Sequence, residues 1–234
     1  MSVRKVHSNG KTIVGYINSD KNLQVIQFES YLEKQFLFHL QYDSEVISIG
    51  CQPVTIKYFK NGEECEYTPD FRVRYKNGRQ VFFEVKSRRN LEKNSRKYAA
   101  SFRAGRQYAA SLGSLFRVIT DKEIKTQYKK SVDFLITFRN SSANLDIQHK
   151  ILSVIREKRI TTFMEVMEAI TADPKERREL IRPFWILLWS QVITANLFEP
   201  LTLQSKVWAT DEKHPPVQLS FPYNRPPKIK SPRA

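Results

Sequence analysis

The sequence predicts an α/β fold: an α/β sandwich built on a mixed sheet, followed by a smaller α+β domain. Segments rich in β-branched and aromatic residues alternate with segments of helical period as far as residue 120, and this order is typical of helices packed on a sheet. The composition changes at the Asn-Ser-Ser stretch 140–142, which is typical of a linker. We therefore expect a first domain over residues 1–140.

The elements predicted for this domain follow in chain order. Two short strands occupy 12–28, and a helix follows over 29–41. Three strands separated by Asn-Gly turns come next, at 46–59, 66–75 and 80–87. Asn90 is the expected N-cap of a helix that runs to about Ser111, and 115–120 reads as a buried strand.

The second predicted domain, residues 141–210, has a winged-helix-like order of elements. Its helices are expected at 145–158, 161–171 and 174–194, and a hairpin-like segment follows them. Winged-helix modules bind nucleic acid or protein. Residues 211–234 contain six of the eleven prolines and read as an extended basic tail.

The charge balance indicates a polyanionic partner. Lys and Arg number 39 against 24 Asp and Glu, a net charge of +15, and such an excess points first to nucleic acid. The two cysteines form no CxxC pair, which excludes a zinc ribbon or finger. With no apolar signal region and no apolar run as long as a membrane span, the chain is expected to be cytoplasmic, without a membrane partner.

The pattern that carries chemistry is Pro69-Asp70, thirteen further residues, and then Glu84-Val85-Lys86. Side chains alternate along a strand, so Glu84 and Lys86 point to the same face. Two carboxylates beside a lysine can hold a divalent cation, and oxygen ligands favour Mg²⁺, with Mn²⁺ as a substitute. Charges that follow the apolar run 81–83 are costly without a function. The pattern therefore favours a PD-(D/E)xK nuclease site over an ordinary surface hairpin.

This site imposes a condition on the turn at Asn77-Gly78. A two-residue turn would pair Asp70 with Val85, so that Asp70 would point away from the face that carries Glu84. We therefore expect a three-residue loop or a bulge there, which Asn-Gly accommodates.

Glu33, on the first predicted helix, is a candidate third acid. A helical glutamate is usually solvated, and Glu29, one turn earlier, can face the same groove. The spacing alone leaves the role of Glu33 open.

A basic stripe begins where the active-site strand ends. The segment 86–106 contains eight basic residues and one acid, which is either a solvated helix face or a phosphate-binding surface. The candidates for DNA binding are Arg88, Arg89, Lys93, Arg96, Lys97 and Arg103.

Four separated motifs resemble, in order, those of the TnsA family, the endonuclease subunits of heteromeric cut-and-paste transposases, some of which are guided by CRISPR effectors. These motifs are residues 28–58, 67–75, 82–87 and 118–124. The resemblance implies a restriction-endonuclease-like PD-(D/E)xK core with Asp70, Glu84 and Glu33 as metal ligands. Lys86 completes the implied catalytic set. Some members of the family have glutamine in place of Glu84.

The resemblance also implies partners. The substrate would be double-stranded DNA at transposon ends, cut at the 5′ ends, on the non-transferred strands. A partner transposase with an RNase H-like fold would cut and join the 3′ ends. An AAA+ regulator ATPase would dock on the C-terminal domain or tail, and the protein would act in the bacterial cytoplasm, at the nucleoid.

Two alternatives stay open at this point. One is a stand-alone restriction or junction-resolving nuclease, and the other is a non-catalytic DNA-binding adaptor that keeps the fold. The complete set of two acids and a lysine argues against the adaptor.

Overall fold

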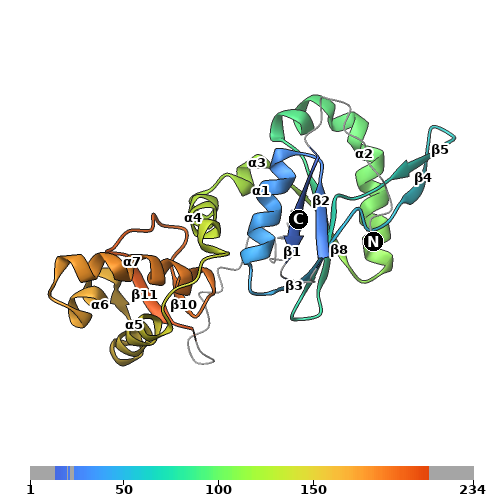
Figure 1. The fold of residues 1–234 in the computed structure, drawn as a ribbon. Coiled ribbons are helices and arrows are strands. Elements are labelled where there is room, and N and C mark those ends of the chain that lie inside the picture. The colour runs from blue at the N-terminus through green and yellow to red at the C-terminus, as the bar shows by residue number, and fades with distance from the viewer. Residues whose placement is uncertain (1–13, 20, 22–23, 211–234) are drawn as a thin grey trace, which may run out of the picture. The chain divides into compact units, whose positions relative to one another are not determined.

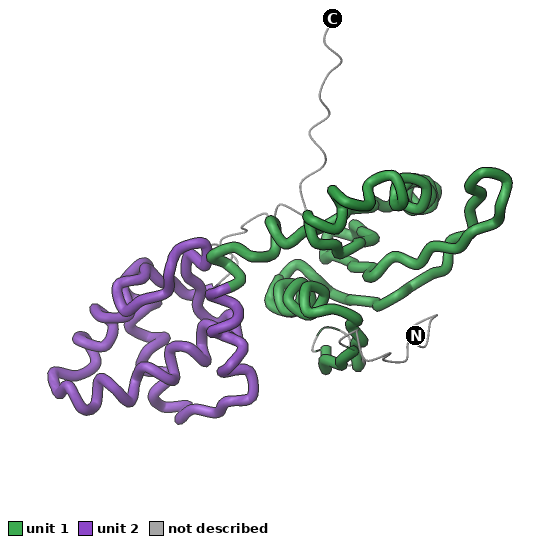
Figure 2. Tube along the Cα trace, turned by 90° about the horizontal axis from the view of Figure 1, so that it is seen from above, with its two compact units in different colours: residues 1–129 green, residues 130–234 purple. Residues whose placement is uncertain are grey.

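A computed structural model describes residues 14–19, 21 and 24–210. The predicted basic tail lies outside these residues. The chain divides into two compact units, residues 1–129 and 130–234 (Figure 2). The sequence analysis places the domain boundary after residue 140, and this boundary between the two functional domains remains a prediction.

The first unit contains a mixed set of strands and helices (Figure 1). Its elements are β1 Gly15–Ser19, β2 Gln24–Phe28, α1 Tyr31–Tyr42, β3 Val46–Cys51, β4 Ile56–Lys60, β5 Glu63–Tyr67, β6 Phe71–Tyr75, β7 Gln80–Val85, α2 Arg88–Ser111, β8 Leu115–Ile119, α3 Asp121–Ile124 and the start of α4, Gln127–Leu135.

The central sheet has the strand order β3-β6-β7-β8. The first two pairs are antiparallel and β7 pairs with β8 in parallel, which confirms the predicted mixed α/β architecture. The two long helices pack on opposite faces of this sheet. The Phe36 ring of α1 lies 5.1 Å from the Phe83 ring, whereas the Tyr108 ring of α2 lies 5.7 Å from that of Phe82.

Two of the predicted strands are each divided in the structure. The segment 46–59 breaks into β3 and β4 at Gln52 and Pro53, where Gln52 has a φ of 42°. The segment 66–75 breaks before Pro69, which has no N–H group to continue a ladder. As a result β4 and β5 form a hairpin separate from the central sheet, and Figure 1 shows it projecting beyond that sheet beside α2.

The second unit contains a helical cluster and a small sheet. Its elements after α4 are η1 Ile136–Phe138, α5 Leu145–Lys158, β9 Thr161–Thr162, α6 Phe163–Ile170, α7 Pro174–Trp189, β10 Ile193–Ala195 and β11 Lys206–Ala209. The expected hairpin is confirmed, since β10 and β11 pair in antiparallel fashion. The third helix ends at Trp189, before its predicted end, because the chain turns at Gln191 with a φ of 59°.

Aromatic rings fill the core of this second unit. The Phe163 ring lies 4.7 Å from that of Phe184 and 4.8 Å from that of Trp185. Trp185 therefore belongs to the core of this unit. Across the described part of the chain, no helix has both the length and the apolar character needed to cross a membrane.

Candidate active site

The loop between β6 and β7 sets the register of the site. The N–H of Tyr75 donates to the carbonyl of Arg79 over 2.9 Å, which leaves three residues, 76–78, in the loop. Gly78 has a φ of 79°, a conformation that glycine adopts without strain. The N–H of Gly78 also donates to the carbonyl of Tyr75 over 3.0 Å. The expected three-residue loop is therefore confirmed.

This loop places Asp70 on the face of Glu84. Phe71 pairs with Phe83, and the same register continued by one residue sets Asp70 opposite Glu84. A two-residue turn would have shifted every side chain of β7 to the other face.

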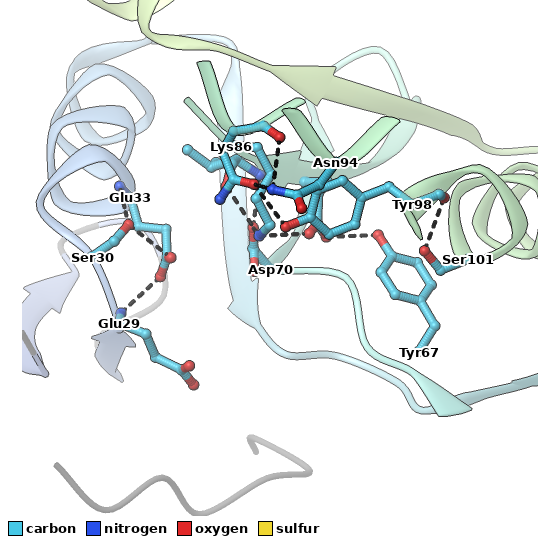
Figure 3. Close-up of polar contacts among 12 residues, drawn as sticks. Glu29, Ser30, Glu33, Tyr67, Asp70, Lys86, Asn94, Tyr98 and Ser101 are labelled. Atoms are coloured by element: carbon cyan, nitrogen blue, oxygen red, sulfur yellow. Dashed lines mark hydrogen bonds and ion pairs between the residues drawn. The ribbon is translucent and has the colours of Figure 1, made fainter. Parts of the chain in front are cut away.

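Asp70, just before β6, and Lys86, just after β7, lie close together (Figure 3), and Glu84 of β7 contacts Lys86. The Nζ atom of Lys86 lies 2.7 Å from Oε1 of Glu84 and 3.5 Å from Oδ2 of Asp70. Oδ2 of Asp70 also accepts a hydrogen bond of 2.7 Å from the N–H of Val85. The structure thus brings together the three residues of the sequence motif.

The two carboxylates of this group lie close together, and burial and charge shift the pKa values of Asp70 and Lys86. Burial, followed by the charge of Glu84, raises the pKa of Asp70 well above its usual value. Burial alone would lower the pKa of Lys86, but the charges of Asp70 and Glu84 outweigh it and raise that pKa above the usual value. One ammonium group therefore compensates two partly buried acids.

This donor set fits a hard divalent cation. Mg²⁺ is commonly held by one or two carboxylates, with water and substrate phosphate completing its shell, and Asp70 and Glu84 supply two carboxylates side by side. Among the residues that the structure describes, no group of three or more His, Cys, Asp or Glu side chains is placed to hold a metal ion. The structure therefore gathers two acids here rather than three.

Glu33 lies apart from this group and takes part in a helix cap. Oε2 accepts from the N–H of Glu29 over 2.7 Å, and Oε1 accepts from the hydroxyl of Ser30, the N-cap of α1, over 2.8 Å. Figure 3 shows its carboxylate turned towards Ser30 and Glu29. Burial raises the pKa of Glu33, while the charge of Lys86 opposes that rise. Glu33 is thus near enough to interact electrostatically with the site without touching it.

Tyr67 is a residue of the site that the sequence analysis did not single out. Its hydroxyl donates a hydrogen bond of 2.6 Å to Oε2 of Glu84, and burial, followed by the charge of Glu84, raises its pKa far above the usual value. The ring packs against Phe102 of α2 and Phe116 of β8, with centroids 6.3 and 6.1 Å away. Both oxygens of Glu84 are therefore engaged, one by Tyr67 and one by Lys86.

Helix α2 begins earlier than predicted. Its N-cap is Ser87, whose hydroxyl accepts from the N–H of Asn90 over 3.2 Å, so the prediction of Asn90 as the N-cap is wrong. The side chain of Asn90 instead accepts hydrogen bonds from Asn94 and Tyr98, over 2.8 and 3.0 Å. Asn94 has non-helical angles, which place a kink six residues after the start of the helix.

The basic candidates on α2 lie exposed. Arg88 is the least available of them, because it forms an ion pair of 2.8 Å with Glu92 and its N–H donates to Asp121. The exposed basic residues are Arg88, Arg89, Lys93, Arg96, Lys97, Arg103 and Arg106. Their binding of DNA stays a prediction.

Comparison with known families finds a match for part of the first unit. Residues 43–121 match the family model described as TnsA-like endonuclease N terminal. This segment is a TnsA-like endonuclease domain. The match confirms the predicted resemblance to the TnsA family and includes Asp70, Glu84 and Lys86, while Glu33 precedes it. No curated protein matches the chain.

The TnsA-like domain supports a nuclease that acts on DNA in Tn7-like transposition, with a transposase as partner. The three converging residues occupy the middle of the matched segment. The geometry and the family thus point to the same part of the chain.

Proposed function

We propose that the protein is a metal-dependent DNA endonuclease that cuts the 5′ ends, on the non-transferred strands, of a transposon. The observation that carries this proposal is the convergence of Asp70, Glu84 and Lys86 within the TnsA-like domain. A partner transposase with an RNase H-like fold would cut the other strands. The resemblance to the TnsA family supports this division of labour.

Asp70 and Glu84 would hold Mg²⁺, or Mn²⁺ in its place, and Glu33 is proposed as a third acid at the edge of the site. A bound divalent cation supplies Lewis-acid polarisation of a phosphate and a more acidic water. The raised pKa of Lys86 keeps its side chain protonated at neutral pH. Lys86 therefore acts as a donor that orients the attacking water and stabilises charge developing on the phosphate, rather than as a base.

The second unit is proposed to be a winged-helix-like module. Its chain order of helix, strand, two helices and two strands supports this, as does the sheet order β10-β11-β9. We propose that this module, or the tail 211–234, docks the AAA+ regulator and the partner transposase.

The test is excision of a transposon end in a reconstituted system with the partner transposase and Mg²⁺. Asp70→Ala is expected to abolish the 5′ cuts and leave the 3′ cuts and DNA binding intact. Glu66→Ala, which removes an exposed acid from the neighbouring strand β5, is the matched control and should cut normally.

Two outcomes would overturn the proposal. Unchanged 5′ cleavage by Asp70→Ala would show that the chain acts as an adaptor. Robust cutting by the isolated wild-type chain, without the transposase, would favour a stand-alone nuclease.

A further inference from the structure

Strand β6 carries a row of arginines on the face of the active site. Its residues alternate between buried and exposed, with Phe71, Val73 and Tyr75 in the core. Arg72 and Arg74 are exposed and point to the opposite face.

That opposite face is the one that carries Asp70. Arg72 pairs with Phe82, whose ring meets α2, and side chains two residues apart on one strand share a face. Asp70, Arg72 and Arg74 therefore form one row, with successive side chains about 7 Å apart. The row leads from the carboxylates along β6 towards the loop 76–78.

The neighbouring edge strand leaves this row open. Across from the arginines on β3 stand the small residues Gly50, paired with Arg72, and Ser48, paired with Arg74. A Cβ atom added to Gly50 would lie 3.9 Å from a terminal nitrogen of Arg72. The guanidinium group of Arg72 therefore lies beside Gly50, and Arg72 is exposed.

The two arginines of the row have no acidic partner among the residues that the structure describes. Within the described part of the chain, neither Arg72 nor Arg74 forms an ion pair, whereas Lys57 on the nearby hairpin pairs with Glu64 over 2.7 Å. Two arginines beside a nuclease site suit phosphate, because their planar guanidinium groups match its geometry. Arg72 and Arg74 lie on the same face as Asp70, so they are placed to contact the phosphates of a strand that extends from Lys86 along β6.

We propose that Arg72 and Arg74 are a phosphate-binding row that holds the DNA backbone next to the phosphate to be cut. This inference rests on the proposed function and adds a second DNA contact, on the sheet rather than on α2. The occupant is the phosphodiester backbone, so the contact does not depend on base sequence.

The experiment measures binding of the full chain to labelled duplex DNA carrying the transposon end, without divalent cations, over a series of KCl concentrations. The slope of log affinity against log salt concentration is negative, and each lost phosphate contact makes it less steep by about 1. Arg72→Ala and Arg74→Ala should each make the slope less steep by about 1, and the double variant should make it less steep by about 2. Lys34→Ala, on α1 over the other face, removes the same charge and is the control.

The outcomes separate this inference from the proposed function. The arginine row would be overturned by an unchanged slope for the double variant, or by an equal loss of steepness for Lys34→Ala. Cleavage by the wild type in the assembled system would still support the nuclease in that case. A less steep slope for the arginine variants, together with no cleavage by the wild type in the assembled system, would support the row and refute the nuclease. If wild-type protein did not bind the duplex, the arginine row would be refuted, and cleavage in the assembled system would still decide the nuclease.

Discussion

The hydroxyl of Tyr67 donates a 2.6 Å hydrogen bond to Oε2 of Glu84, whose other oxygen lies 2.7 Å from Lys86. Glu84 is only 4% exposed, so its carboxylate is held from both sides inside the protein. The position of this proposed metal ligand therefore depends on a tyrosine from a different hairpin.

Tyr67→Phe should weaken the site without unfolding it. A hydrogen bond to a charged group contributes about 1.5–3 kcal/mol, and a loss of about 1.4 kcal/mol at the transition state lowers a rate about 10-fold. We expect at least that loss in 5′ cleavage, together with weaker Mn²⁺ binding by calorimetry. Tyr58→Phe, on the same hairpin, is the control. Equal Mn²⁺ affinity in Tyr67→Phe and wild type would contradict this role.

Gly105→Ala should destabilise the first unit, although alanine normally stabilises a helix by about 1 kcal/mol over glycine. A Cβ atom there would lie 2.8 Å from the Phe116 ring and 2.9 Å from the Tyr67 ring, and overpacking costs about 1–3 kcal/mol. Thermal unfolding should show a lower melting temperature. Ser95→Ala, exposed on the same helix, should leave it nearly unchanged or raise it. A stabilised Gly105→Ala would show that the rings move aside freely.

The charge of Glu33 and its hydrogen bonds at the N-terminus of α1 can be tested with separate substitutions. The glutamine oxygen can still accept from the N–H of Glu29, and its amide group can donate to the Ser30 hydroxyl. Glu33→Gln should therefore fold normally and yet cut at least 10-fold more slowly if the charge of Glu33 serves the metal site. Ser30→Ala should instead cost about 1 kcal/mol of stability, as loss of an N-cap does, and cut normally once folded. Normal cutting by Glu33→Gln would assign Glu33 to the helix cap alone.

His39 should make the first unit less stable in mild acid. Its side chain is 1% exposed, and burial, followed by the charge of Lys129, lowers its pKa to about 3. Below about pH 6.5 the unfolded chain binds a proton that the folded chain does not, so the free energy of unfolding falls as pH falls towards 3.

The loss due to His39 should reach about 1.4 kcal/mol per pH unit. Denaturant unfolding between pH 7 and 4 should show a flatter curve for His39→Gln than for wild type. His149→Gln, exposed on α5, should follow the wild-type curve. Parallel curves for His39→Gln and wild type would refute this origin of the acid sensitivity.

The catalytic motif could be predicted because it depends on local rules. Strand alternation aligns Glu84 with Lys86, and the required position of Asp70 predicts the three-residue loop. Tyr67 could not be predicted in the same way. In one continuous strand it would face away from Asp70, and only the break before Pro69 lets both side chains reach Glu84. The spacing Ser30-x-x-Glu33 is typical of a helix cap, a signal that the sequence analysis did not use when it named Glu33 as a candidate acid.

The three-residue loop 76–78 makes the number of residues between the two strands a condition for activity. Deleting one residue would slide β7 by one position, so that Phe83 and Val85 would occupy the face of Asp70. Substitutions within the loop leave this count unchanged. Natural variation here should therefore alter which residues form the loop more readily than how many, and an engineered insertion should preserve an odd count.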